Sequence, residues 1–90
     1  MSTTTKKFRE FMAEPLGDKG IRDVPGIGEV LGTKLADAGY EKAYVLFGKF
    51  LLSNKDPESF QDWLQTQCGA NSHQAKTTTQ ALSDWAEAFI

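Results

Sequence analysis

Two glycines flank a single apolar residue in Gly26-Ile27-Gly28, and this short turn is the part of the chain best suited to bind an anion. Glycine has no Cβ, so such a turn can take positive φ and bring its backbone N–H groups close to a ligand. A helix that begins at Glu29 would add its unpaired N–H groups and the positive end of its dipole. These features together fit a phosphate of a nucleic-acid backbone.

The residues on either side of this turn have the spacing of two short helices that pack together. Apolar and small residues, with one lysine, stand at helical intervals around it: Ile21, Val24, Leu31, Gly32, Lys34 and Leu35. We expect Ile27 to point inward and the small Gly32 to let the second helix lie close to the first. This register is the signature of a helix-hairpin-helix, placed at about residues 21–38.

Two observations limit this interpretation. A Gly-x-Gly turn alone is also typical of helical hairpins that bind nothing, and only the full register, with Lys34 included, favours a phosphate site. Glu29 is acidic and stands beside the proposed phosphate, but it can instead cap its own helix by facing the dipole.

The composition describes one small domain, residues 1–90, with more aromatic surface than it can easily hide. Aromatic residues make up 11% of the chain and include Trp63 and Trp85. A domain of this size buries only about 60–65% of its unfolded surface, so we expect part of the apolar surface to lie at an interface.

Charge and cysteine usage indicate a nuclear or cytosolic protein. The net charge is −2, but residues 1–34 carry +1 and the remainder −3, so the basic residues gather near the N-terminus and the turn. The single Cys68 cannot form an internal disulfide. No run approaches the roughly 20 apolar residues of a membrane span, and the N-terminus lacks a signal-peptide core, so we expect no membrane insertion.

The pattern along the chain predicts an all-α fold, a compact bundle of five to six short helices. Helices are expected after the Ser2–Thr5 run as far as Pro15, within the hairpin, from about Glu41 to Ser53, from Asp56 to Gly69, and from Asn71 or Ser72 onward. Gly48 interrupts the third of these, and an interior glycine predicts close approach of another backbone, within the fold or across a dimer.

The sequence offers no catalytic or metal-binding cluster, so we expect neither an enzyme nor a cofactor. His73 has no ligand partner at a suitable spacing and is interpreted as a surface residue. The run Thr77-Thr78-Thr79 is interpreted as polar helix surface.

Along its whole length the chain resembles the barrier-to-autointegration factor family. The matching stretches are Phe11–Gly17, Gly26–Glu29, Ala38–Tyr40, Lys42–Gly48, Trp63-Leu64, Cys68–Ala70 and the ending Leu82, Trp85, Phe89. The resemblance implies an obligate homodimer whose subunits each bind double-stranded DNA without sequence preference, so that one dimer bridges two duplexes and compacts DNA. It also implies LEM-domain proteins of the inner nuclear membrane and A-type lamins as partners, histones as further candidates, and a place at chromatin and the nuclear envelope, in nucleus and cytoplasm.

The resemblance also assigns residues to these roles. DNA contacts carry over to Lys7, Gly26, Ile27, Gly28, Val30, Lys34 and Lys76, and the basic first turn adds Lys6. The dimer and partner surface is placed at Gly48, Leu51, Leu52 and Trp63. Phosphorylation at Ser2, Thr3, Thr4 or Thr5 would set negative charge beside the basic first turn and repel DNA.

The chain departs from the family pattern at Ser53-Asn54-Lys55, Ser59 and Gln65, which are more polar or less basic than the usual residues near the LEM-domain groove. Two other functions therefore stay open. One is a helical protein-interaction module of the sterile-alpha-motif type, which binds no DNA. The other is a regulatory paralogue that keeps the fold and dimerises with an active relative.

Overall fold

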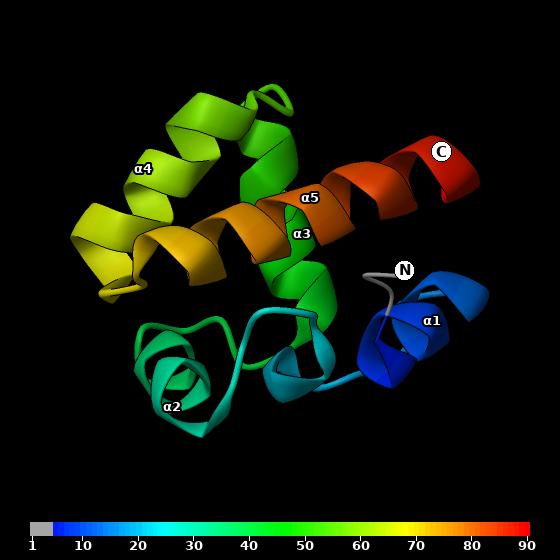
Figure 1. The fold of residues 1–90 in the computed structure, drawn as a ribbon, viewed down its shortest axis with the longest axis horizontal. Helices are drawn as coiled ribbons and strands as arrows, with labels where there is room; N and C mark the ends of the chain where they lie inside the picture. Colours follow the sequence, from blue (N-terminus) through cyan, green and yellow to red (C-terminus); the bar gives the residue numbers. More distant parts are fainter. Residues whose placement is uncertain (1–4) are drawn as a thin grey trace.

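The computed structural model describes residues 5–90 and is all-helical over that range, which confirms the predicted fold class. Its elements are α1 (Lys6–Ala13), the 3-10 turn η1 (Ile21–Asp23), α2 (Glu29–Asp37), α3 (Ala43–Leu52), α4 (Pro57–Cys68) and α5 (Ser72–Phe89). The long helix α5 crosses the molecule, with α1, η1 and α2 on one side, α4 on the other and α3 passing behind it (Figure 1).

The helix ends lie where local signals predict them. The Thr5 hydroxyl accepts the Phe8 N–H at 3.1 Å to cap α1. Asp56 caps α4, and Gly69 ends that helix with a left-handed φ of 75°. Asn71 and Gln74 form a reciprocal capping box at the start of α5, with bonds of 2.8 and 2.9 Å.

The third helix is shorter than the predicted range of 41–53. Residues 41 and 42 are extended because they pair with the segment before η1. The Ile21 N–H donates to the Glu41 carbonyl at 3.0 Å, and the Ala43 N–H donates to the Lys19 carbonyl at 2.9 Å. This cross-connection holds the start of α3 against the hairpin.

One apolar core joins all the elements. Aromatic rings run through it in edge contacts, with Phe50 against Phe60 at 5.2 Å and Phe47 against Trp85 at 5.1 Å between centroids. The Trp85 indole donates to the Glu14 carbonyl at 3.0 Å, which fixes the end of α1 on α5. The core therefore sets α1 and the hairpin in place relative to α5.

The interpretation of Thr77–Thr79 as polar surface is wrong for two of the three residues. Thr78 and Thr79 are buried, with 0% and 2% of their surface exposed, because the hairpin and the core cover this face of α5. The Thr78 hydroxyl donates to the Pro25 carbonyl at 3.0 Å. The Thr79 hydroxyl has no hydrogen-bond partner among residues 5–90.

These neighbouring threonines should respond in opposite directions to the same substitution. Thr79→Val should raise the free energy of unfolding by about 1 kcal/mol, because it removes a buried hydroxyl that lacks a partner. Thr78→Val should lower it by about 1–2 kcal/mol, because the buried Pro25 carbonyl loses its donor. Urea unfolding at one fixed protein concentration measures both changes, and shifts of the same sign would contradict the assignment.

Candidate functional site

The hairpin turn places its two glycines in different backbone conformations. Gly26 has a φ of 90°, whereas Gly28 is extended with a φ of −99°, so positive φ is needed at only one of them. A Cβ on Gly26 would lie 2.5 Å from the Thr78 Oγ1 and 3.1 Å from the Gln74 carbonyl oxygen. A Cβ on Gly28 would meet no atom within 4 Å. Gly26 therefore allows the hairpin to pack on α5, and Gly28 leaves the outer surface open.

Unpaired backbone donors line this open surface. The first hydrogen bond of α2 runs from the Gly32 N–H to the Gly28 carbonyl at 2.8 Å. Within residues 5–90 the N–H groups of Gly28, Glu29 and Val30 have no partner, as expected at a helix start. All three residues are exposed, and Val30 has 70% of its surface accessible. Ile27 is buried as predicted, and its N–H donates to the Val24 carbonyl at 3.1 Å, so Ile27 adds no unpaired donor to this surface.

The acidic residue of this surface is paired with Arg22 of η1. The Arg22 Nε lies 3.4 Å from the Glu29 Oε1, and its guanidinium donates to the Thr33 hydroxyl at 2.8 Å. The stem of Arg22 occupies the space beside Gly32, where a Cβ would lie 2.6 Å from the Arg22 Cγ. Gly32 thus makes room for the Arg22 side chain of η1, which is a single 3-10 turn where the sequence predicted a short helix. Sequence reasoning missed Arg22, although the small residue one turn into α2 signalled a close neighbour.

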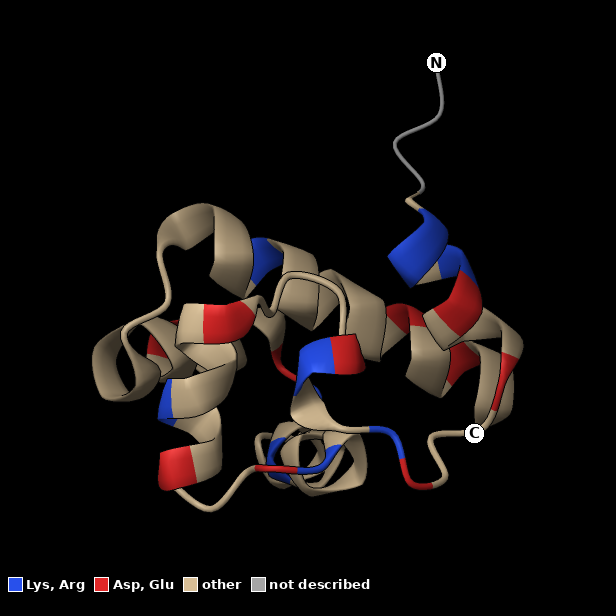
Figure 2. Ribbon diagram, turned by 90° about the horizontal axis from the view of Figure 1, so that it is seen from below, with Lys and Arg blue, Asp and Glu red and all other residues tan. Residues whose placement is uncertain are grey.

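The basic residues assigned to the site lie at different distances from the turn. Lys6 is exposed, with its Nζ 3.9 Å from Glu10, and together with Lys7 it forms the basic first turn of α1 (Figure 2). The half-buried Lys7 donates to the Ile27 carbonyl at 2.6 Å. Desolvation by burial lowers the pKa of Lys7, and the nearby charge of Asp23 raises it in part.

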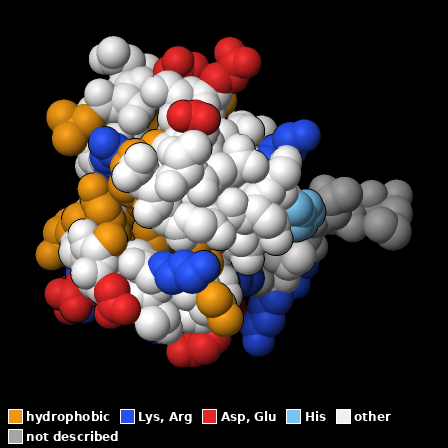
Figure 3. Space-filling view, turned by 90° about the vertical axis from the view of Figure 1, so that its left-hand side faces the viewer, with side chains coloured by type: hydrophobic (Ala, Val, Ile, Leu, Met, Phe, Trp, Pro, Cys, Tyr) orange, Lys and Arg blue, Asp and Glu red, His pale blue; other side chains and the backbone are white. Residues whose placement is uncertain are grey.

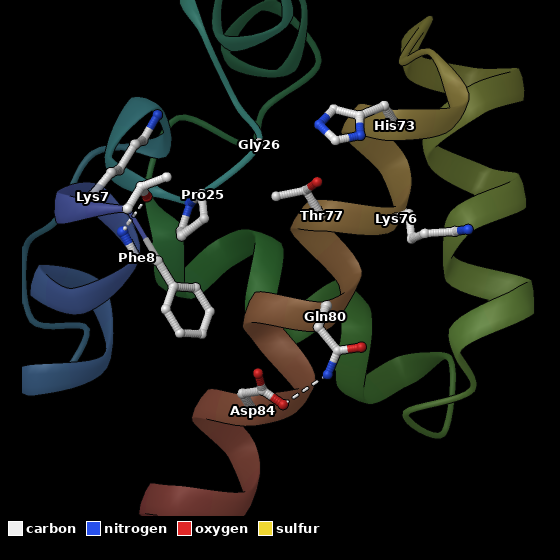
Figure 4. A pocket seen from close by; sticks show the side chains of 10 residues that line it. Lys7, Phe8, Pro25, Gly26, His73, Lys76, Thr77, Gln80 and Asp84 are labelled. Atoms are coloured by element: carbon white, nitrogen blue, oxygen red, sulfur yellow. Dashed lines mark hydrogen bonds between the residues drawn. The ribbon is translucent and has the colours of Figure 1, made fainter. Parts of the chain in front are cut away.

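Two further lysines are directed toward α4 and not toward the turn. The Lys34 amine lies at the end of α4, 3.0 Å from where a Cβ of Gly69 would be. Lys76 lines a groove with its stem, while its amine points away toward α4 (Figure 4). Of the predicted basic contacts, the structure brings only Lys7 into contact with the turn.

A groove of about 850 Å³ lies between α1, the hairpin and α5. Phe8, Pro25 and Thr77 form much of its wall, and the His73 ring points across its mouth toward Gly26 (Figure 4). His73 is exposed as predicted, but it belongs to the surface that includes the hairpin. The sequence could have indicated this placement, because Thr77 lies one turn further along the same face of α5.

A second exposed surface, the outer face of α3, is apolar. Tyr44, Leu51 and Leu52 are 53%, 41% and 81% exposed, and a Cβ on Gly48 would meet no atom within 4 Å. The close approach predicted at Gly48 is therefore not made within the described chain. Hydrophobic side chains gather along the edge of the molecule opposite the pale blue histidine (Figure 3).

Trp63 of α4 lies next to this outer face. The Lys49 Nζ lies 5.0 Å above its ring, and Tyr40 makes an edge contact at 5.1 Å. The contact between the Lys49 amine and the Trp63 ring connects α3 to α4. Trp63 is one of the residues that the sequence analysis assigned to the partner surface.

Some predictions concern features outside these two surfaces. Ser2, Thr3 and Thr4 lie outside the described residues, and Thr5 is the exposed cap of α1. Over residues 5–90 no three side chains of the metal-ligating types come together, and no helix is long and apolar enough to cross a bilayer.

The fold and the turn define an all-α protein with a helix-hairpin-helix surface, and comparisons identify its family. The family model described as Barrier to autointegration factor matches residues 2–89. The human Barrier-to-autointegration factor is 47% identical over 88 residues, which cover 98% of this chain and 99% of the human one. Barrier-to-autointegration factor 1 of Caenorhabditis elegans is 48% identical over 88 residues, covering 98% and 99% of the two chains. The Drosophila melanogaster protein is 46% identical over 90 residues and 100% of both chains.

The chain therefore belongs to the barrier-to-autointegration factor family, which confirms the resemblance found in the sequence.

The two glycines of the turn should differ in their tolerance of a methyl group. Gly26→Ala should lower the free energy of unfolding by at least about 1–2 kcal/mol, the cost of a left-handed backbone alone. Gly28→Ala should change it by less than about 0.5 kcal/mol, because the site is open and φ is negative. Urea unfolding checks both, and equal losses would mean that the two glycines share one structural role.

Proposed function

We propose that this protein binds double-stranded DNA without sequence preference and bridges two duplexes as a homodimer. The observation that carries the proposal is the open row of backbone N–H groups at Gly28, Glu29 and Val30. Donors of this kind bind phosphate oxygens and are indifferent to base identity, which accounts for binding without sequence preference. We treat residues 1–90 as one functional domain.

A net charge of −2 is compatible with this function because the surface supplies local positive potential. The dipole of α2 adds a partial positive charge at the turn. Gly26 lies against the first turn of α5, beside the Gln74 carbonyl. The positive end of a second helix dipole is therefore near the turn. Pairing with Arg22 offsets the carboxylate of Glu29, which stands in the row of N–H groups itself.

The basic side chains complete the proposed DNA surface in different ways. Lys6 can extend to a phosphate, since its one ion pair within residues 5–90 is an exposed contact with Glu10 of α1. The amines of Lys34 and Lys76 lie on flexible stems at the α4 side and would reach the flanks of a duplex centred on the turn. Gly26 would contribute backbone contact and Val30 apolar contact, while the buried Ile27 would hold the turn on the core.

The composition of α3 supports the dimer. Lys49 is its only charged side chain, and a helix that is apolar all round is normally buried on all sides. Within one protomer only the face with Leu46 and Phe50 is covered. A second copy packed at Gly48, Leu51 and Leu52, beside Trp63, would bury the other face.

The remaining parts of the proposal rest on the family. The partners would be LEM-domain proteins, A-type lamins and histones, in the nucleus and cytoplasm and at chromatin and the nuclear envelope. The protein would act without catalysis or cofactor. Phosphates on Ser2, Thr3, Thr4 or Thr5 would stand beside Lys6 and weaken DNA binding by charge repulsion.

Gly28→Glu should abolish DNA binding while the helical content stays the same, because the new side chain covers the N–H row and adds a like charge. The measurement is a mobility shift with long duplex DNA at two salt concentrations, beside circular dichroism. Ser59→Glu, an exposed position on α4, is the matched control for charge and should bind as the wild type does. Binding by Gly28→Glu at physiological salt would place the DNA elsewhere. A wild-type protein that dimerises without binding DNA would instead support the regulatory paralogue.

Gly48→Glu should convert the dimer into folded monomers, because a charge at a closely packed apolar interface costs more than the contact stabilises. Folding should persist, since no atom of another element lies within 4 Å of the new Cβ. Light scattering after size exclusion gives the mass, and Ala88→Glu, at an exposed position near the end of α5, is the control for charge. A dimeric Gly48→Glu protein would move the interface away from α3.

A further inference from the structure

Lys7 and Lys6 are neighbours in sequence but differ in environment. Lys6 is exposed and lies near Glu10 of its own helix. Lys7 is half-buried, and its Nζ donates to the Ile27 carbonyl, 20 residues away, at 2.6 Å. This is the hydrogen bond by which α1 holds the hairpin turn, because the Thr78 bond to Pro25 comes from α5.

The direction of the Ile27 carbonyl determines the direction of the next N–H group. A trans peptide unit is planar, so its C=O and N–H point in opposite directions. Because Lys7 holds the Ile27 oxygen on the α1 side, the Gly28 N–H is turned away from α1. That N–H is among the donors without a partner in residues 5–90, and Gly28 is exposed.

Glycine at position 28 makes this restraint necessary. A peptide unit can rotate when the residue after it tolerates both signs of φ, and glycine does so at no steric cost. Gly28 has no side chain, and a Cβ there would meet no atom outside its chain neighbours and its own helix within 4 Å, so no side-chain packing fixes its φ. The residue that opens the surface therefore also leaves the peptide free to turn.

We propose, building on the DNA-binding function above, that Lys7 is a positioning residue that holds the Ile27–Gly28 peptide with its N–H toward the DNA phosphate. Its amine is held by a carbonyl of the turn, and in this role the bond to that carbonyl is what DNA binding requires of it. The lowered pKa of Lys7 agrees with this placement, since its largest cause is removal from solvent.

Salt dependence of DNA binding separates positioning from phosphate pairing. A lysine that pairs with a phosphate contributes about 0.9 to the slope of log K against log salt. Lys7→Met keeps the apolar stem and should weaken binding at least about tenfold at every salt concentration, the effect of losing one charge-assisted hydrogen bond, with the slope unchanged. Lys6→Met removes the same charge one residue away and should lower the slope. A slope lowered by about 0.9 in Lys7→Met would overturn the proposal.

The free protein provides a test that does not depend on DNA. Relaxation dispersion of backbone amides should show microsecond-to-millisecond exchange at Gly28 in Lys7→Met and not in Lys6→Met. An unchanged Gly28 amide in a folded Lys7→Met protein would also overturn the proposal. Lys7→Gln, whose shorter side chain cannot reach the carbonyl, should repeat the result if Lys7→Met folds poorly. A wild-type protein that fails to bind DNA would refute the proposed function, and the amide measurement would still decide the role of Lys7.

Discussion

The packing of the hairpin turn on α5 is the contact on which the rest of the structure depends. Gly26 has a φ of 90°, and its backbone lies so close to Thr78 and Gln74 of α5 that there is no room for a side chain at this position. The Thr78 hydroxyl then holds the turn through the Pro25 carbonyl. Because α5 also packs against α1, α3 and α4, this junction connects the turn to the whole core.

Features with local causes could be predicted from the sequence, and features made by distant partners could not. Asp56 and Asn71 cap their helices with their own side chains, so the helix starts follow from a few adjacent residues. Thr78 is different, since a threonine within a helix indicates polar surface until the segment that covers it is known. Its partner, Pro25, is 53 residues away.

The same distinction applies within the candidate site. The open start of α2 at Gly28 and the buried Ile27 follow from spacing alone. The different roles of the two glycines could not be predicted, because one touches α5 and the other faces solvent. The directions of the lysine amines depend on the same tertiary contacts. Lys7 reaches a carbonyl of the turn, whereas Lys34 lies beside Gly69.

In the proposed dimer, the outer face of α3 would tie the stability of the fold to the protein concentration. An apolar stripe that includes Tyr44 and Leu52 is solvated in a lone protomer and buried when a second copy covers it. By mass action, association that requires the folded state makes unfolding harder as concentration rises. Dilution alone would then lower the free energy of unfolding. The folded fraction in a cell would depend on how much of the protein the cell makes.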